Sequence, residues 1–474
     1  MLIQTDLPKP DPDQDPVLLV PHVVRGRTEL GSAVVHRSRA TKSAVATAAL
    51  DLDALIWPRA QLPPAFDTPI AEIVDFLVET GERLTFDRNP YLQEALGHMV
   101  HFSTLGPRVL ENSYRDIALM FRRDGLQAEL ERSLGDVRAI DGWPSINAGR
   151  DTRVRAAPPR LVHILAGNAP IVPPISIIRG ALSKGVNLLK MPSNDMFTAT
   201  AILRTMADID PSHPVVQSFS AVYWRGGDSK TESALFRSQY FDKIVVWGGE
   251  SAVRHVLKYV GPGLEMISFD PKVSISLLGH EIFTSERMLD AAAARGAHDV
   301  ISLNQDACTA SRYQFVEGSV EEVDRYCERL LRAMAVDVRY GAGPGGPIPP
   351  PFALEALDML SYLEPLYAVF GQPDGGGMVV RSQEPIDFHP SGKLVNVVQV
   401  DRLEHALPHV TVATQTVGIY PPARRVALRD RLASAGVQRI ITLGEVGAFG
   451  GVPHDASWPL HRFMRWVLDE GAEQ

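Results

Sequence analysis

Short apolar segments alternate with helix-like segments from about residue 160 onward, and this alternation limits the chain to few folds. Four apolar segments have the length of buried strands, at 160–167, 187–191, 219–224 and 243–247. Segments with helical spacing lie between and after them, at 172–183, 197–207, near 230 and at 251–258. Buried strands that alternate with helices are typical of a parallel sheet. The sequence therefore predicts an α/β protein.

A second block with the same alternation follows residue 308. It contains a strand at 312–317, a helix around Cys327, a Gly/Pro-rich break at 341–351, a helix near 353–368, and strands near 376, 394, 415 and 439. This order predicts a second α/β domain. Earlier in the chain we expect a strand at 17–20, helices near 69–83 and 92–131, and a protruding hairpin at 136–155.

The composition argues against a nucleic-acid or membrane role. The 474 residues are 45% hydrophobic and 22% charged, which suits two or three globular domains. A formal net charge of -9 disfavours binding to a phosphate backbone, so we expect no nucleic-acid partner. Residues 161–178 mimic a membrane span, but His163, Asn168 and the prolines among them would leave polar groups unsatisfied in lipid. We expect no membrane span.

The two cysteines have different surroundings. Cys327 lies on the apolar stripe of a predicted helix, so we interpret it as a packing residue. No Cys/His cluster has zinc spacing, and two such different cysteines do not make a disulfide framework. These features predict a cytoplasmic protein without a structural metal. Residues 1–16 are acidic and proline-rich and lack signal-peptide features, so we expect a flexible leader.

Cys308 lies in the polar segment Ser302-Leu-Asn-Gln-Asp-Ala-Cys-Thr-Ala-Ser311, just after a predicted helix. A thiol attacks as the thiolate, which nearby amides or positive charges stabilise. A polar loop can supply such groups, whereas a sealed core cannot. A cysteine is more often a small buried hydrophobe, but this setting favours a nucleophile.

Three candidate binding groups follow predicted strands, at the edge where ligands bind in open α/β sheets. The Asn168 amide could donate to a developing oxyanion, or it could form a turn. Lys190 could hold a ribose hydroxyl or a phosphate, or it could be a solvated lysine. Gly248 and Gly249 open a helix whose free N–H groups could bind an anion, although a tight turn without ligand is nearly as good an interpretation.

Two further motifs favour structural interpretations. The segment Gly341-Ala-Gly-Pro-Gly-Gly346 matches G-x-G-x-x-G, but prolines follow it where a dinucleotide-binding turn would continue into a helix. We interpret it as a loop. His454 and Asp455 are adjacent in a turn-like segment, and neighbouring side chains rarely face each other, so we do not expect a catalytic pair there.

Taken together, Asn168, Lys190, Gly248-Gly249 and Asn304 before Cys308 resemble the aldehyde dehydrogenase superfamily in order and spacing. The resemblance is closest to the acyl-CoA reductase family that supplies long-chain aldehyde to bacterial luciferase. It extends from about residue 65 and is carried by the segments Phe269-Asp-Pro-Lys-Val-Ser274, Gln415-Thr-Val-Gly-Ile-Tyr420, Val452-Pro-His-Asp-Ala-Ser-Trp-Pro-Leu460 and Arg465-Trp-Val467.

This resemblance implies an aldehyde-dehydrogenase-like fold with a Rossmann-like cofactor domain, a catalytic domain and a small oligomerisation arm. We expect a flexible leader at 1–16, a mostly helical part of the cofactor domain at 17–135, the arm at 136–155, the NADP-binding core at 156–280, the catalytic domain with Cys308 at 281–445 and a C-terminal segment at 446–474. By resemblance, the arm predicts a homo-oligomer.

The resemblance also implies an acyl thioester reductase instead of a hydrolytic dehydrogenase. Ordinary aldehyde dehydrogenases have a water-activating glutamate where this chain has Ser268. Without that base, an acyl group on Cys308 should survive to be reduced. Asn168 and the Cys308 N–H would hold the oxyanion. Glu265 is close in sequence, so an aldehyde dehydrogenase that releases free acid is the alternative, as is a catalytically silent subunit.

Ser193 stands where NAD-preferring relatives have an acidic residue, which favours NADPH over NADH as the cofactor. Glu384, or Asp387 in the same segment, resembles the carboxylate that holds the nicotinamide ribose in the superfamily. The substrate would be a long-chain acyl group on CoA or on a protein thioester. The luciferase-linked relatives imply a partner enzyme that activates fatty acids.

Overall fold

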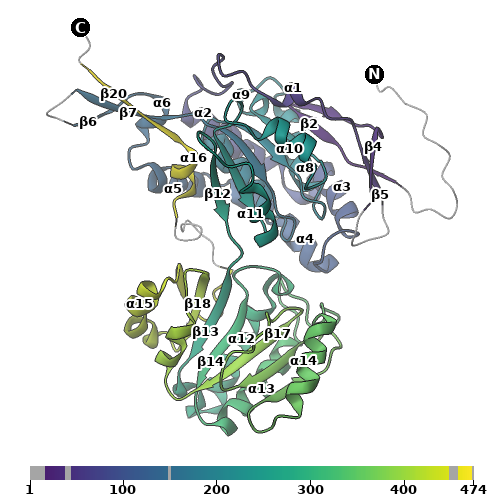
Figure 1. Ribbon diagram of the computed structural model, residues 1–474, viewed down its shortest axis with the longest axis vertical. Helices are drawn as coiled ribbons and strands as arrows, with labels where there is room; N and C mark the ends of the chain where they lie inside the picture. The colour runs from purple at the N-terminus through teal and green to yellow at the C-terminus, as the bar shows by residue number, and fades with distance from the viewer. Residues whose placement is uncertain (1–16, 38–43, 148–150, 448–456, 472–474) are drawn as a thin grey trace.

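Two seven-stranded sheets dominate the computed structural model, which describes residues 17–37, 44–147, 151–447 and 457–471. Figure 1 shows the two sheets one above the other, joined where β12 leads to β13. The predicted leader and the His454-Asp455 pair lie outside the described residues.

The first sheet is mainly parallel, with the order β12-β11-β8-β9-β10-β2-β3. Its strands are β2 (His22–Val24), β3 (Arg27–Glu29), β8 (Arg160–Ile164), β9 (Val186–Lys190), β10 (Phe219–Val222), β11 (Lys243–Trp247) and β12 (Glu265–Phe269). The four segments predicted as strands between 160 and 247 form its centre. β2 and β3 are added antiparallel at one edge.

Both faces of this sheet are apolar because successive strand residues pack against helices on opposite sides. Leu161 and Leu189 contribute to one hydrophobic cluster, whereas Val162 and Leu188 contribute to another. The helices around the sheet are α2 (Ile70–Arg83), α3 (Pro90–Met99), α4 (Pro107–Arg115), α5 (Arg123–Leu134), α7 (Val172–Leu182), α8 (Thr198–Ile209), α10 (Ser229–Leu235) and α11 (Glu250–Val256).

The second sheet has the order β15-β16-β17-β14-β13-β18-β19. Its strands are β13 (Val273–Leu278), β14 (Ser311–Glu317), β15 (Ala368–Gly371), β16 (Met378–Ser382), β17 (Leu394–Val400), β18 (Thr414–Tyr420) and β19 (Arg439–Thr442). Its helices are α12 (Glu286–Ile301), α13 (Val320–Met334), α14 (Pro351–Ser361) and α15 (Ala423–Ala435). Because β13 is a central strand here, the boundary expected at residue 280 moves to about residue 270.

Two elements differ from the sequence expectation in the described chain. The helix predicted at 353–368 ends at Ser361, and β15 then runs antiparallel to β16. The hairpin predicted at 136–155 begins with the short helix α6 (Arg138–Asp141), and its strands are β6 (Ser145–Asn147) and β7 (Thr152–Ala157). The C-terminal strand β20 (Arg465–Glu470) pairs with β7, so the arm has three strands.

The N-terminal segment forms a third, small sheet of β1 (Leu18–Leu19), β5 (Ala44–Thr47) and β4 (Val34–Arg37). In Figure 1 this sheet and the arm lie on opposite sides of the first sheet. β5 is largely buried, so the sheet packs onto the body of the protein.

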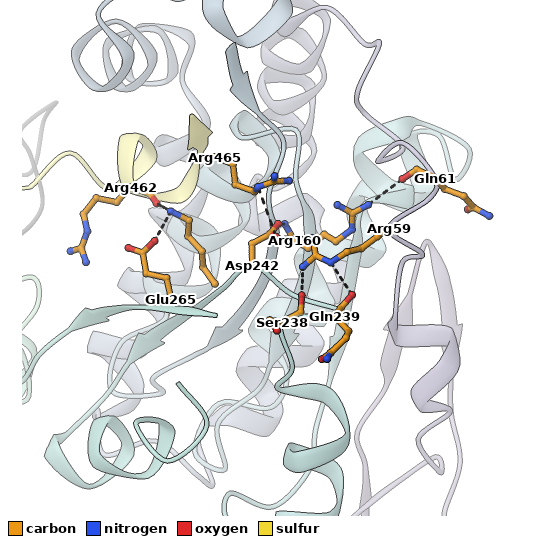
Figure 2. A network of polar contacts seen from close by, with 10 residues as sticks. Arg59, Gln61, Arg160, Ser238, Gln239, Asp242, Glu265, Arg462 and Arg465 are labelled. Carbon is orange, nitrogen blue, oxygen red and sulfur yellow. Dashed lines mark hydrogen bonds and ion pairs between the residues drawn. The ribbon is translucent and has the colours of Figure 1, made fainter. Parts of the chain in front are cut away.

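The amino ends of the first sheet carry a network of paired charges, drawn in Figure 2. Asp242 precedes β11, and its carboxylate accepts from Arg59 Nη1 and from the backbone N–H of Arg160, both at 2.8 Å. The Nζ of Lys243 lies 2.9 Å from Glu265 Oε2. These four charged side chains and a backbone amide therefore satisfy one another at this edge.

Candidate active site

A cavity of about 2100 Å³ lies at the carboxyl ends of the strands of the first sheet and reaches the loop before β14. Most of the predicted site residues line it: Asn168, Lys190, Ser193, Gly248, Gly249 and Cys308. Because carboxyl ends of parallel strands meet at one edge, residues far apart in sequence share this wall.

The loop that carries Cys308 begins with three strained residues. Leu303, Asn304 and Gln305 have φ values of 47°, 52° and 66°, although none of them is glycine. Side chains rarely adopt this region, and such residues persist only where surrounding contacts fix them. Here α12 ends just before the loop, and the left-handed turn redirects the chain so that Cys308 reaches the cavity wall.

Hydrogen bonds from three directions fix this turn. Asn304 Oδ1 accepts from the backbone N–H of Ala342 at 3.0 Å. Gln305 Nε2 donates to the carbonyl of Leu394 at 2.7 Å. Arg312 Nη2 donates to the carbonyl of Gln305, also at 2.7 Å. The turn is therefore held by β14, by β17 and by the glycine-rich segment near residue 342.

The glycine-rich segment predicted to be a loop is packed around a buried lysine. Lys393 Nζ donates to the carbonyls of Ala342 at 2.8 Å and Gly375 at 2.7 Å, and burial lowers its pKa to about 8. Ala342 in turn fixes Asn304. The segment thus supports the Cys308 loop.

Asn168 connects the two halves of the site. Its Nδ2 donates to the carbonyl of Asp306 at 3.1 Å, two residues before Cys308. A side-chain amide has two N–H donors, so one remains for a ligand oxygen. Asn168 is thereby tied to the loop that carries Cys308, and both residues line the same cavity.

Three titratable residues that the sequence analysis did not identify lie around Cys308. Asp306 and Arg312 line the cavity with it, and so does His389. Burial raises the pKa of Asp306, whose carboxylate accepts a hydrogen bond from Thr104. Burial and then the positive charge of Arg312 lower the pKa of His389 to about 4, so this imidazole is neutral at pH 7.

Arg312 is a buried cation close enough to Cys308 to interact with it electrostatically. Its Nη1 donates to the carbonyl of Pro390 at 2.5 Å. Within the described ranges no carboxylate lies at ion-pair distance from Arg312, although the Asp306 charge interacts with it more strongly than Cys308 does. A positive charge near Cys308 favours its thiolate. In the sequence, Arg312 stands out only as a charged residue at the start of a predicted apolar strand.

Cys327 provides the contrast that the sequence predicted. It is buried in the cluster between α12 and α13, and burial raises the pKa of its thiol well above the ordinary value. A thiol in that setting stays protonated and unreactive. Cys308 is partly exposed on the cavity wall.

The half of the cavity that was expected to bind the cofactor carries two cations, Lys190 and Arg225. Lys190 ends β9, and its side chain is buried, with Nζ 5.7 Å from the centre of the Tyr223 ring. Burial lowers the pKa of Lys190 from 10.5 to about 8. Neither Lys190 nor the exposed Arg225 forms an ion pair within the described part of the chain. Ser193 is exposed on the same wall.

Gly248 and Gly249 form the turn between β11 and α11. A Cβ on Gly248 would lie 3.2 Å from the Cβ of Ala252, whereas a Cβ on Gly249 would meet nothing within 4 Å. No side chain caps α11 at Gly249. The turn is therefore open to the cavity at Gly249 and close-packed at Gly248.

Glu384 does not reach the cavity. Its side chain is 79% exposed, and Oε2 lies 3.5 Å from His409 Nε2. Asp387 is also exposed and away from the cavity wall. The segment leaves the sheet after β16 with these carboxylates toward solvent, and only His389 returns to the cavity. The placement of Glu384 from the resemblance therefore needs correction.

Glu265 also lies away from the thiol. It starts β12 beside Lys243, whereas the cavity begins at Phe269, the other end of the same strand. At about 3.3 Å per residue, the two strand ends are on the order of 13 Å apart. Ser268 carries no carboxylate. The acidic groups that line the cavity include Asp270 and Asp306, and Asp306 lies two residues before Cys308.

Within the described ranges, the His, Cys, Asp and Glu side chains form no group of three or more able to hold a metal ion. In the same ranges, no helix has both the length and the apolar character that a membrane crossing requires.

Sequence comparison now adds to this geometry. The family model for acyl-CoA reductase (LuxC) matches residues 65–339 and 364–466. The chain belongs to the acyl-CoA reductase (LuxC) family. It is 28% identical over 421 residues to a long-chain acyl-protein thioester reductase of Vibrio harveyi, covering 85% of this chain and 83% of the relative. It is 29% identical over 410 residues to the protein of that name from Photorhabdus luminescens, covering 84% and 82%.

Solved structures show the fold of this LuxC-family chain. A NAD-dependent benzaldehyde dehydrogenase from Corynebacterium glutamicum superposes with a TM-score of 0.69 at 14% identity, covering 95% of this chain and 98% of that one. A NADP-dependent glyceraldehyde-3-phosphate dehydrogenase from Bacillus halodurans C-125, complexed with NADP, has a TM-score of 0.68 at 13% identity, with the same coverage. The chain has the aldehyde dehydrogenase fold, as the sequence resemblance implied.

Proposed function

We propose that this chain reduces a long-chain acyl thioester to the aldehyde with NADPH, through an acyl group carried by Cys308. The observation that carries the proposal is the single cavity shared by Cys308, Asn168 and the cation-bearing ends of β9 and β10. Membership of the acyl-CoA reductase family supports the reaction type.

The chain supplies the groups for acyl transfer. The Cys308 thiolate, favoured by Arg312, attacks the thioester carbonyl, and the electrons of the C=O bond move to oxygen. The remaining N–H of Asn168 and the backbone N–H of Cys308 are suited to hold that oxyanion. Collapse breaks the bond to the carrier sulfur, and the carrier leaves as a thiol after taking up a proton. The acyl group is then a thioester of Cys308.

The cofactor half fits a phosphorylated nucleotide. Lys190 is a buried ammonium on the cavity wall that lacks an ion pair with any described carboxylate, and such a group needs an anionic or hydroxyl-rich ligand. Lys190, Ser193 and the Gly248-Gly249 turn would hold the nucleotide. When bound, the reduced nicotinamide supplies the hydride that converts the Cys308 thioester to the aldehyde level. Breaking the remaining C–S bond then restores the thiolate.

NADPH is preferred in this proposal because no acidic residue stands at Ser193. A carboxylate there would repel a ribose 2′-phosphate, whereas a serine hydroxyl can donate to it. NADH is the weaker alternative.

The cavity is large enough for two ligands. Binding pockets for one small molecule typically occupy roughly 300–1,000 Å³, and this cavity is about twice the upper value at about 2100 Å³. One part of its wall is apolar and comes from η2 (Ile117–Phe121), α7 and the Cys308 loop, with side chains that include Met120, Val172, Ile175 and Leu303. We assign the acyl chain to this part.

The free-acid reaction lacks the base that was expected for it. Ser268 carries no carboxylate, and Glu265 is paired with Lys243 at the opposite strand end. Asp270 and Asp306 line the cavity, and Asp306 already accepts a hydrogen bond from Thr104. We propose that neither activates water at the acyl group.

The donor is an acyl-CoA or an acyl-protein thioester. The relatives are named for acyl-protein thioesters, which favours delivery by a partner enzyme that activates fatty acids. The two free cysteines suit a reducing compartment such as the cytoplasm.

The arm supports a homo-oligomer. Its strands β6 and β20 are the outer strands of a three-stranded sheet, and Ile146 and Leu468 on them are more than half exposed. Exposed apolar side chains on outer strands favour addition to a neighbouring chain. Light scattering after size exclusion should give a dimer or tetramer, and a monomer at micromolar concentration would contradict this assignment.

Product analysis tests the proposed function. The purified chain is incubated with a long-chain acyl-CoA and NADPH, and aldehyde and free acid are quantified by mass spectrometry. We expect aldehyde in equal amount to NADPH consumed, and little acid. Acid formed from aldehyde and NADP without CoA would instead support the aldehyde dehydrogenase alternative. Neither product, with no acyl group on Cys308, would support a catalytically silent subunit.

A further inference from the structure

The N-terminal sheet of β1, β4 and β5 contributes to the cavity although it precedes the part of the chain that matches the family. The match begins at residue 65, whereas Val35, His36 and Val45 line the cavity. This stretch of wall is therefore built by residues that lie before the family match. His36 is the one of these three side chains that can exchange a proton near pH 7.

Contacts fix His36 beside the cofactor half of the cavity. Its ring meets the Tyr223 ring edge to face, with centroids 4.8 Å apart and an interplanar angle of 86°. Its Nε2 lies 3.3 Å from Thr47 Oγ1. Tyr223 is held in turn, because its backbone N–H donates to His22 Nε2 at 3.1 Å. Since Lys190 Nζ also contacts the Tyr223 ring, His36 and Lys190 share one neighbour.

The charges around His36 are positive. Arg225 lines the same cavity. Burial lowers the pKa of His36, and the positive charge of Arg225 lowers it further. The carboxylate that interacts with Lys190 belongs to Glu232, which is already engaged 2.6 Å from His255 Nε2 and 3.1 Å from the Tyr259 hydroxyl. Lys190, Arg225 and His36 thus gather without an ion pair to any described carboxylate.

We propose that His36 is a specificity-determining residue for the ribose 2′-phosphate of NADPH, with the N-terminal sheet as one wall of the phosphate site. This inference rests on the proposed function, since it specifies how its cofactor is selected. A phosphate dianion takes several donors, and charge-assisted bonds are the strongest. If Nε2 accepts from the Thr47 hydroxyl, the single N–H of the neutral imidazole lies on Nδ1 and can donate to a phosphate oxygen.

The test is ligand binding to the full chain by calorimetry at pH 6.5, without acyl substrate. The probes are NADPH and NADH, together with their fragments 2′,5′-ADP and 5′-AMP. We expect H36Q to weaken NADPH and 2′,5′-ADP by roughly tenfold, as for one lost charge-assisted hydrogen bond, and to leave NADH and 5′-AMP within about twofold. H405Q is the matched control, because His405 is exposed beside the second sheet.

A second variant, T47V, tests the inference in case H36Q does not fold. T47V removes the hydroxyl next to Nε2 while keeping the shape of the side chain, and we expect a smaller loss, again limited to the phosphorylated ligands. Equal weakening of all four ligands would mean that His36 contacts the adenosine and would overturn the inference. Unchanged NADPH affinity in both variants would overturn it as well and leave the proposed function standing. Failure of the unaltered chain to bind NADPH would overturn the cofactor assignment too.

Discussion

The two edges of the first sheet differ in whether their charged side chains form ion pairs. At the amino edge, Arg59 pairs with Asp242 and Lys243 pairs with Glu265 (Figure 2). At the carboxyl edge, Lys190 at the end of β9 is buried without an ion pair to any carboxylate in the described ranges. Paired charges satisfy the fold, whereas an unpaired buried ammonium costs stability.

The size of that cost indicates a function. Burial lowers the pKa of Lys190 from 10.5 to about 8, which corresponds to a cost on the order of 3 kcal/mol at pH 7. The folded-state pKa lies below the unfolded value, so the cost is complete below pH 8 and disappears as the pH rises toward 10.5. A ligand that supplies negative charge offsets it. The comparison therefore separates an edge that stabilises the chain from an edge to which we assign binding and reaction.

The largest expected effect lies at the reactive edge. Replacing Cys308 with alanine removes the nucleophile, so aldehyde formation should fall to background while nucleotide affinity and the unfolding midpoint stay unchanged. Steady-state assays, calorimetry and thermal melting measure the three quantities. Residual turnover above background would exclude Cys308 from the reaction.

Asn168→Ala should slow acyl transfer by roughly a hundredfold or more, because one oxyanion donor is lost. Stopped-flow release of the carrier thiol measures this step separately from reduction. Asn168 also bonds the Asp306 carbonyl, so Asn168→Asp, which keeps the shape but loses the donors, serves as the matched variant. A rate within threefold of the unaltered chain in both variants would contradict the assigned role.

Asp242→Ala tests the stabilising edge. It removes the carboxylate that accepts from Arg59 Nη1 and from the Arg160 N–H, so the free energy of unfolding should fall by about 2 kcal/mol. NADPH affinity should not change. Asp290→Ala breaks an exposed pair with Arg329 and is the control, with an expected loss below about 0.5 kcal/mol. A loss of nucleotide binding in Asp242→Ala would break the comparison between the edges.

Lys190→Met should raise the free energy of unfolding, whereas Asp242→Ala should lower it. Methionine fills similar space without a buried charge, so the chain should gain about 1–2 kcal/mol in unfolding free energy at pH 7 while nucleotide binding weakens. The gain should shrink when the denaturant titration is repeated at pH 9.5, because the unaltered lysine is then mostly neutral in the folded state. Destabilisation at both pH values would show that Lys190 is satisfied within the fold.

The smallest effect is expected at Ser193. Ser193→Glu should weaken NADPH by roughly tenfold through charge repulsion at a partly desolvated site, with NADH changed much less. Ser193→Gln separates charge from size. Equal affinities for both nucleotides in the glutamate variant would mean that the 2′-phosphate binds elsewhere.

Local sequence patterns were enough to predict the main strands and the loop that brings Cys308 to the cavity. Strand ends followed by polar residues located Asn168 and Lys190, and the structure brings both to one cavity with Cys308. This succeeded because parallel strands bring their carboxyl ends together whatever lies between them in sequence.

Features that depend on distant contacts were missed. β20 completes the arm by pairing with β7 across some three hundred residues, and no local pattern signals that pairing. Arg312 and His389 come from separate segments and meet only in the folded chain. The position of Glu384 was inferred from a motif whose segment turns outward here, so its carboxylate faces solvent beside His409.

Intact-mass spectrometry after incubation with a long-chain acyl-CoA, without nucleotide, tests the central claim most directly. We predict a mass increase of one acyl group, mapped by peptide analysis to Cys308 and absent from Cys327, that disappears with aldehyde release when NADPH is added. An unshifted mass with both acyl-CoA and acyl-protein donors, or an acyl group on another residue, would contradict the account.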